Sequence, residues 1–175
     1  MSEVLLRGIE ITHVLDCIAD PTKIRVVAEL SDDVSGVMPY LNALLRKASY
    51  NHAAQILHFN LEYRMITLYA RMVTMAKVDD EVDARRIADW LRDLINDAYR
   101  RRGEIEPSYA YRPALKPLDV YRLLPRENCK RCGEATCMAF AFRLCQGRGR
   151  VDECCVLSEG RFRRHREALS DLVGA

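Results

Sequence analysis

The sequence predicts an α+β fold in two parts: an N-terminal antiparallel sheet with two helices, and a small helical domain after it. Three observations lead to this prediction. Apolar and polar residues alternate through much of the first 78 positions, a long amphipathic segment follows, and a proline-rich stretch then precedes a cysteine-rich C-terminal part. The predicted domains are residues 1–103 and 118–175, joined by a linker over residues 104–117.

Most of the N-terminal domain is predicted as strands. Residues 5–19 and 23–30 flank the turn signal Asp20-Pro21, and together they predict a β-hairpin. Residues 54–61 and 65–78 are rich in strand-forming side chains and contain no glycine or proline. These two segments predict two or three further antiparallel strands.

Two helices complete the predicted N-terminal domain. Cap-type residues precede an apolar stripe over residues 37–48, and Pro39 falls in the first turn, where its missing N–H costs nothing. Residues 79–102 predict the longer helix, because acidic residues cluster at its start and arginines at its end, as the helix dipole prefers. Gly103 ends this helix. Its apolar face comprises Ile87, Ala88, Leu91, Leu94, Ile95 and Ala98.

Three short helices are predicted in the C-terminal domain. The first begins at Pro117 with the segment PLDVYRLL. The second is the segment MAFAFRLCQ, which Thr136 can cap at its start and Gly147 can close at its end. The third covers residues 158–173, in which arginines surround a narrow apolar side.

Four cysteines with compact spacing lie around the second of these helices. Cys129 and Cys132 can both point inward from one tight turn, which Gly133 lets the backbone leave at unusual dihedral angles. Cys137 falls on the first turn of the helix, where unpaired amides favour a thiolate. Cys154 returns after the helix. Thiolates are soft ligands that select zinc, copper(I) or iron–sulfur clusters.

The segment LLPRENCKRCGEATCMAFAFRLCQGRGRVDECC resembles the four-cysteine [4Fe-4S] domain of the large subunit of corrinoid iron–sulfur proteins. It is similar, more loosely, to the B subunit of Rnf-type electron-transport complexes. Besides the cysteines, the residues that match are Asn128, Gly133, Thr136, Phe140, Ala141 and Gly147.

This resemblance implies a ligand set and a metabolic setting. The implied ligands of the [4Fe-4S] cluster are Cys129, Cys132, Cys137 and Cys154. The implied setting is anaerobic, low-potential metabolism, with a corrinoid protein among the candidate partners. The chain departs from the family pattern at Cys155, where proline is usual, and at Lys130, where glycine is frequent.

A structural zinc site is the alternative for the same four cysteines. Zinc sites commonly pair two Cys-x-x-Cys knuckles, whereas this segment contains one. The remaining spacings of four and sixteen residues are untypical of zinc. The spacing therefore favours the cluster.

The other cysteines and the histidines are predicted to have no ligand role. Cys145 is rotated by about 80° from Cys137 on the same helix, which suggests a buried side chain. Cys155 is a reserve ligand at best, because adjacent side chains diverge in extended backbone. Cys17 is expected in the core. Three histidines lack a metal-ligand pattern: His13, His52 and His58.

Composition and charge limit the classes of partner. Seven cysteines, an odd number, without a signal-peptide pattern predict a reducing cytoplasmic location, and no segment has the roughly twenty apolar residues that a membrane span needs. Residues 1–125 hold 17 basic and 18 acidic side chains, and residues 126–175 hold 10 and 7. That basic bias is too weak to predict nucleic-acid binding.

Two function hypotheses follow. The first is an electron-transfer protein, in which Arg126, Lys130 and Arg131 form a docking face for an acidic redox partner. The second is a non-redox binding or scaffold protein, in which a cluster or zinc only staples the C-terminal domain. Nucleic-acid binding through the arginines of residues 161–166 is a variant of the second. An enzyme in its own right ranks last, because four cysteine ligands leave no iron open to substrate.

Overall fold

The computed structural model describes residues 4–113 and 115–173, and the chain divides into two compact units. The first unit ends at Arg112 and the second begins at Pro113. Each unit has its own hydrophobic core. The architecture is α+β, as the sequence predicts.

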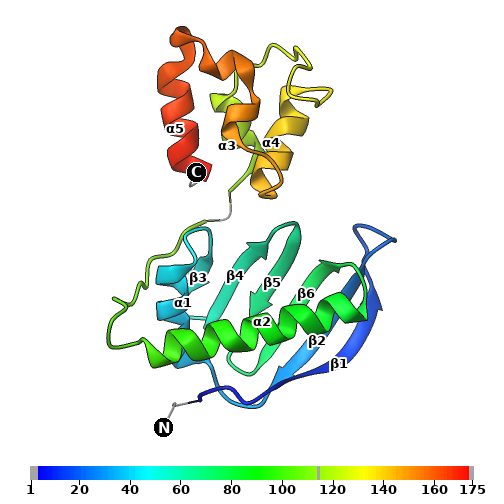
Figure 1. Cartoon of the computed structure of the whole chain (residues 1–175), viewed down its shortest axis with the longest axis vertical. Coiled ribbons are helices and arrows are strands. Elements are labelled where there is room, and N and C mark those ends of the chain that lie inside the picture. Colours follow the sequence, from blue (N-terminus) through cyan, green and yellow to red (C-terminus); the bar gives the residue numbers. More distant parts are fainter. Residues whose placement is uncertain (1–3, 114, 174–175) are drawn as a thin grey trace. The chain divides into compact units, whose positions relative to one another are not determined.

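A six-stranded antiparallel sheet in the order β1-β2-β6-β5-β4-β3 forms the first unit (Figure 1). Its strands are β1 (Ile9–Asp16), β2 (Ile24–Leu30), β3 (Ser49–Asn51), β4 (Ile56–Leu61), β5 (Arg64–Leu68) and β6 (Met72–Val78). The predicted hairpin is β1–β2, in which Ile9 lies opposite Leu30 and Asp16 opposite Ile24. The other predicted strands are β4, β5 and β6. The sequence missed β3, because three residues are too few to show an alternation.

Both predicted helices of this unit pack on the sheet and share its core. The 3-10 turn η1 (Ser35–Val37) leads into α1 (Met38–Leu44), which carries Pro39 in its first turn as predicted. The long helix α2 (Glu81–Arg100) runs across the sheet (Figure 1). Five of its predicted apolar residues are buried, namely Ile87, Ala88, Leu91, Ile95 and Ala98, and Leu94 packs against them partly buried.

Buried polar side chains, which the sequence did not single out, also hold α2. Arg64, 11% exposed, meets Asp83 with two hydrogen bonds, from Nε to Oδ2 at 2.8 Å and from Nη2 to Oδ1 at 3.0 Å. Near the other end of α2, the Asn96 Oδ1 accepts from the backbone N–H groups of Leu5 and Leu6, and its Nδ2 donates to the Leu6 carbonyl. The Asn96 side chain thus hydrogen-bonds to the backbone of the N-terminal segment as a neighbouring β-strand would.

Part of the segment predicted as a linker lies in the first unit. The fully buried Asn42 of α1 donates to the carbonyls of Ser108 at 2.8 Å and Ala110 at 3.1 Å. Arg112 donates to the Asn42 carbonyl at 2.9 Å and to its Oδ1 at 3.0 Å. These contacts fix residues 108–112 against α1, which prolines and polar composition alone could not indicate.

The second unit is a small helical one. Its helices are α3 (Pro117–Leu123), α4 (Cys137–Cys145) and α5 (Arg163–Val173), with 3-10 turns η2 (Val151–Glu153), η3 (Cys155–Ser158) and η4 (Gly160–Phe162). The predicted tail helix therefore starts later than residue 158, because η3 and η4 occupy its first part. The core of the second unit consists of Val120, Leu124, Phe140, Ala141, Leu144, Val151, Cys154, Val156, Leu157, Leu169 and Val173. In neither described stretch, 4–113 or 115–173, does a helix have the length and apolar character to cross a membrane.

Replacing Asn96 should destabilise the first unit. Asn96→Ala leaves three backbone groups of Leu5 and Leu6 without their partner, which should cost about 2–3 kcal/mol of unfolding free energy. The urea midpoint should fall by about 1 M. The chain's single tryptophan, Trp90, lies on α2, so its fluorescence reports on this unit alone. Asn60→Ala, at an exposed position of β4, is the control, and equal midpoints for the two variants would contradict this role.

Candidate metal centre

The structure gathers the four predicted ligands around the core of the second unit. Cys129 and Cys132 lie in the irregular loop of residues 125–136, Cys137 is the first residue of α4, and Cys154 lies between η2 and η3. Cys154 belongs to the core at 7% exposure, and the other three pack against it partly buried. All four thiols therefore border one apolar cluster.

The loop that carries the first two cysteines has an unusual backbone. Three of its non-glycine residues adopt positive φ, namely Arg126 (62°), Asn128 (48°) and Lys130 (61°), and Gly133 follows at 85°. Left-handed residues that alternate with ordinary ones are typical of nests, in which successive N–H groups line an anion-binding concavity, including iron–sulfur sites. A non-glycine residue in this region costs about 1–2 kcal/mol. The loop thus fits a negatively charged thiolate cluster.

Two side chains fix the start of α4 against this loop. The Asn128 Oδ1 accepts from the backbone N–H of Cys137 at 2.8 Å. Thr136 is the N-cap that the sequence predicts, and its Oγ1 accepts from the N–H of Ala139 at 3.1 Å. Because Asn128 directly precedes Cys129, its hydrogen bond brings the first and third cysteines to the same end of the helix.

Charge interactions link Cys154 to two of the other cysteines. Burial raises the pKa of the Cys154 thiol, and the nearby Cys132 and Cys137 raise it further, although backbone hydrogen bonds from Val156 and Leu157 oppose them. The structure therefore brings Cys154 near the second and third cysteines across the intervening helix. Among the described residues, no three His, Cys, Asp or Glu side chains converge on a single ion.

Cys155 occupies a different environment from Cys154. It is exposed, and its sulfur hydrogen-bonds to Arg131, whose pKa it raises together with the nearby Cys129. Cys155 thus lies near the ligand loop but outside the core that holds Cys154. The two adjacent thiols point to different surroundings, as expected for neighbours in sequence.

Two further thiols, one half-buried and one buried, lie away from solvent to different degrees. Cys145, at the end of α4, is half-buried, and its burial raises the pKa to about 11, with a smaller effect from Asp119. It therefore remains a neutral thiol near pH 7. Cys17 in the first unit is 6% exposed. Both positions agree with the buried role that the sequence predicts.

Each of the three histidines in question contacts a hydroxyl group. The ring Nδ1 atoms of His13, His52 and His58 lie 3.0 Å from Thr12 Oγ1, 3.0 Å from Tyr50 OH and 2.9 Å from Thr67 Oγ1 respectively. Burial also lowers the pKa of His58. Hydrogen bonds of this kind, to nearby hydroxyl groups, are ordinary for histidines in strands and loops.

One arginine of α4, which the sequence suggests near the cluster together with Arg148 and Arg150, joins parts of the centre through contacts that the sequence did not predict. Arg143 of α4 donates from Nη2 to the carbonyl of Cys132 at 3.3 Å and to the carboxylate of Glu153. Its Nε lies 3.2 Å from Glu134 Oε1, an ion pair without hydrogen-bond alignment. Its position on the same helix as Cys137 is the sequence signal that places it near the centre.

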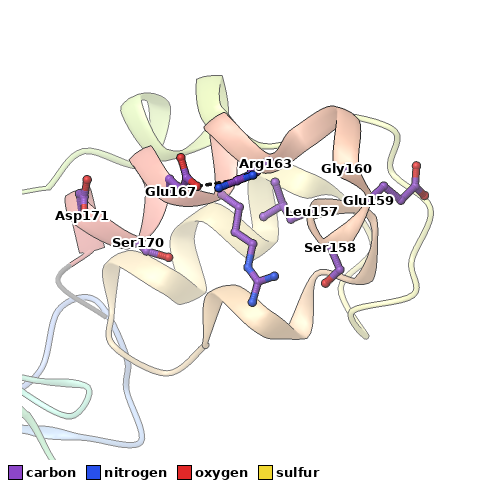
Figure 2. A pocket seen from close by; sticks show the side chains of 9 residues that line it. Leu157, Ser158, Glu159, Gly160, Arg163, Glu167, Ser170 and Asp171 are labelled. Atoms are coloured by element: carbon purple, nitrogen blue, oxygen red, sulfur yellow. Dashed lines mark hydrogen bonds and ion pairs between the residues drawn. The ribbon is translucent and has the colours of Figure 1, made fainter.

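A groove in the second unit lies along α5. It has a volume of about 670 Å³ and is lined by Leu157, Ser158, Glu159, Gly160, Arg163, Arg166, Glu167, Ser170 and Asp171 (Figure 2). Inside it, Arg163 pairs with Glu167 at 3.0 Å. The lining includes acidic and basic side chains but none of the cysteines, so this groove is separate from the metal centre.

A family described as "Putative Fe-S cluster" matches residues 124–156, the segment that holds all four cysteines. A segment of the acetyl-CoA decarbonylase/synthase complex subunit gamma of Methanothermobacter thermautotrophicus is 54% identical over 56 residues, which are 32% of this chain and 12% of that subunit. The corresponding subunit of Methanocaldococcus jannaschii is 36% identical over 59 residues, 34% of this chain and 12% of that subunit.

A bacterial protein matches in the same way. The corrinoid/iron-sulfur protein large subunit of Moorella thermoacetica is 42% identical over 55 residues, 31% of this chain and 11% of that subunit. The chain thus spans about an eighth of the length of the curated relatives it matches. No solved structure matches the chain. Residues 124–156 therefore match the Fe–S cluster domain family, and the C-terminal part of the chain is similar to a segment of these gamma and large subunits.

Proposed function

We propose that the second unit binds a [4Fe-4S] cluster and exchanges single electrons with a protein partner. The proposed ligands are Cys129, Cys132, Cys137 and Cys154. The observation that carries the proposal is their arrangement: all four thiols border one core, next to a loop whose alternating φ angles suit an anionic cluster. The family match over the same residues supports it.

The chain's own residues would perform three tasks around the cluster, which supplies one-electron redox chemistry when bound. The buried Phe140, Ala141 and Leu144 exclude water on the core side. The loop amides present partial positive charge, and Asn128 fixes Cys137 at the helix start. The exposed loop leaves the opposite side open to a partner.

The partner that this surface suits is an acidic protein. Arg126, Lys130 and Arg131 are all exposed in the ligand loop. Exposed cations beside the electron-exchanging centre attract an acidic surface over a Debye length of about 8–10 Å. The names of the relatives suggest low-potential anaerobic metabolism, with a corrinoid protein or another subunit of such a complex as the candidate partner.

A structural staple is the second candidate. The second unit has a core of eleven buried residues, and residues 125–136 form neither helix nor strand. The core of a unit this small rarely supplies more than about 3–5 kcal/mol, and many small proteins add a disulfide, a metal or a partner. Binding energy from a metal can then serve folding alone. The potential measurement below separates this role from electron transfer.

The metal content should identify the centre. Protein purified without oxygen should be brown, lose its visible absorbance with dithionite, and hold about four irons per chain. Iron, acid-labile sulfide and zinc should be counted on the same sample. A colourless protein with one zinc per chain would overturn the cluster and leave the staple.

The four proposed ligands should be distinguishable from the other thiols. Replacing Cys129, Cys132, Cys137 or Cys154 with serine should each lose or degrade the cluster, because serine is a poor iron ligand. Iron content and the visible spectrum measure this. Cys17→Ala, Cys145→Ala and Cys155→Ala are controls that should retain the iron. Loss of iron in Cys155→Ala together with its retention in Cys154→Ser would move the fourth ligand to Cys155.

The cations of the loop should raise the reduction potential. Reduction takes a cluster with four thiolates from a net charge of about −2 to about −3, so nearby cations favour the reduced state. Replacing Lys130 and Arg131 together with glutamine should lower the potential, on the order of tens of millivolts. Redox titration measures this shift. The matched control is Arg85→Gln with Arg86→Gln, which removes two exposed cations from α2.

The same pair of variants tests docking. Reoxidation by an acidic electron-acceptor protein should be slower without Lys130 and Arg131, and the difference should shrink at high ionic strength because salt screens steering. Equal reoxidation rates for the variant and its control would contradict the proposed docking face. A cluster that cannot be reversibly reduced would contradict electron transfer and leave the structural role of the metal as the remaining candidate.

A further inference from the structure

Arg143 contacts both halves of the proposed ligand set. Its guanidinium reaches the main-chain carbonyl of Cys132 at 3.3 Å and Glu134 at 3.2 Å in the ligand loop. It also donates to Glu153, which directly precedes Cys154. The Glu153 carboxylate in turn accepts from the backbone N–H of Arg150 at 2.8 Å, which fixes the return segment.

The surroundings hold the guanidinium in one place. Its side chain is 26% exposed, and its Cζ lies 5.2 Å from the centre of the Phe140 ring. Gly149 leaves room for it, because a Cβ there would lie 3.3 Å from Arg143 Nε and 3.5 Å from its Cγ. Two carboxylates balance its charge, so its contacts fix positions more than they add net charge.

We propose that Arg143 is a positioning residue, which holds the Cys132 loop and the Cys154 segment at the separation that the cluster needs. This inference rests on the proposed function. The planar guanidinium has five donors in a fixed fork, and it meets three partners from two segments. Both hydrogen bonds, to Cys132 and to Glu153, come from Nη2, whereas Nε faces Glu134 as an ion pair. A lysine ammonium has a single nitrogen, so it cannot occupy both positions.

The test compares the properties of the cluster with the amount that is bound. Arg143→Lys and Arg143→Gln are each purified without oxygen in the full chain, with Arg164→Gln, an exposed position on α5, as the control. For each protein, the EPR signal of the dithionite-reduced cluster is normalised to bound iron, and the rate of iron release to a chelator is measured. Circular dichroism checks the fold.

Both Arg143 variants should release iron about tenfold faster, as for the loss of other contacts that orient metal ligands. Their reduced-cluster EPR signals should be broadened or split, because the ligand geometry is no longer unique. A purely structural arginine would lower the iron content but leave the normalised signal unchanged, and this outcome would overturn the inference, as would release rates equal to the control.

A double-mutant cycle identifies the contact that acts. If Arg143 positions Cys154 through Glu153, the double variant Arg143→Gln/Glu153→Gln should release iron only slightly faster than either single variant. Its fold increase in release rate should therefore be much less than the product of the two single-variant fold increases. Multiplicative effects would overturn this route. If the wild-type protein itself contains no cluster, the proposed function fails and this inference with it. A wild-type cluster that Arg143 variants leave unchanged refutes the positioning role alone.

Discussion

The second unit depends on one constraint: thiols between positions 129 and 154, far apart along the chain, all pack on one small core. The helix α4 alone cannot do this, because two of the four thiols precede it and one follows it. The chain meets the constraint with an irregular loop before α4 and a return through η2 after it. The helix packs on the core through Phe140, Ala141 and Leu144, so the segments on both sides of it are anchored to the same surface.

The conformation of the ligand loop has an energetic consequence. Arg126 and Lys130 at positive φ together cost about 2–4 kcal/mol, whereas Asn128 adopts this region more readily. A core as small as that of the second unit supplies a net stability of about 3–5 kcal/mol, so the strain is comparable to all that the core contributes. Binding free energy of a metal centre becomes folding free energy in small domains, so a bound centre can offset this strain. In the proposed holo protein, the cluster and the second unit therefore stabilise each other, whereas the first unit has its own extensive core.

Sequence patterns revealed the regular elements and the cysteines, but not the polar contacts that join distant segments. The period of apolar residues is sufficient to predict β1–β2 and α2, and Thr136 has a local role that its position before α4 indicates. Asn96 and Arg143 act on partners far along the chain or on the backbone, and their own neighbours in sequence contain no trace of this. The strand β3 was missed for another reason, because three residues cannot show a period.

The basic residues of the second unit divide into two kinds by their surroundings. Arg143 is partly buried between Glu134 and Glu153, so its charge is largely balanced and its contribution is geometric. Lys130 and Arg131 are exposed in the loop itself, where their field extends into solvent. Salt screens exposed charges much more than buried pairs. Ionic strength should therefore affect encounters with the proposed partner while leaving the geometry of the ligand segments intact. Within one short stretch of chain, the exposed cations thus serve partner binding and the partly buried Arg143 serves the structure of the centre.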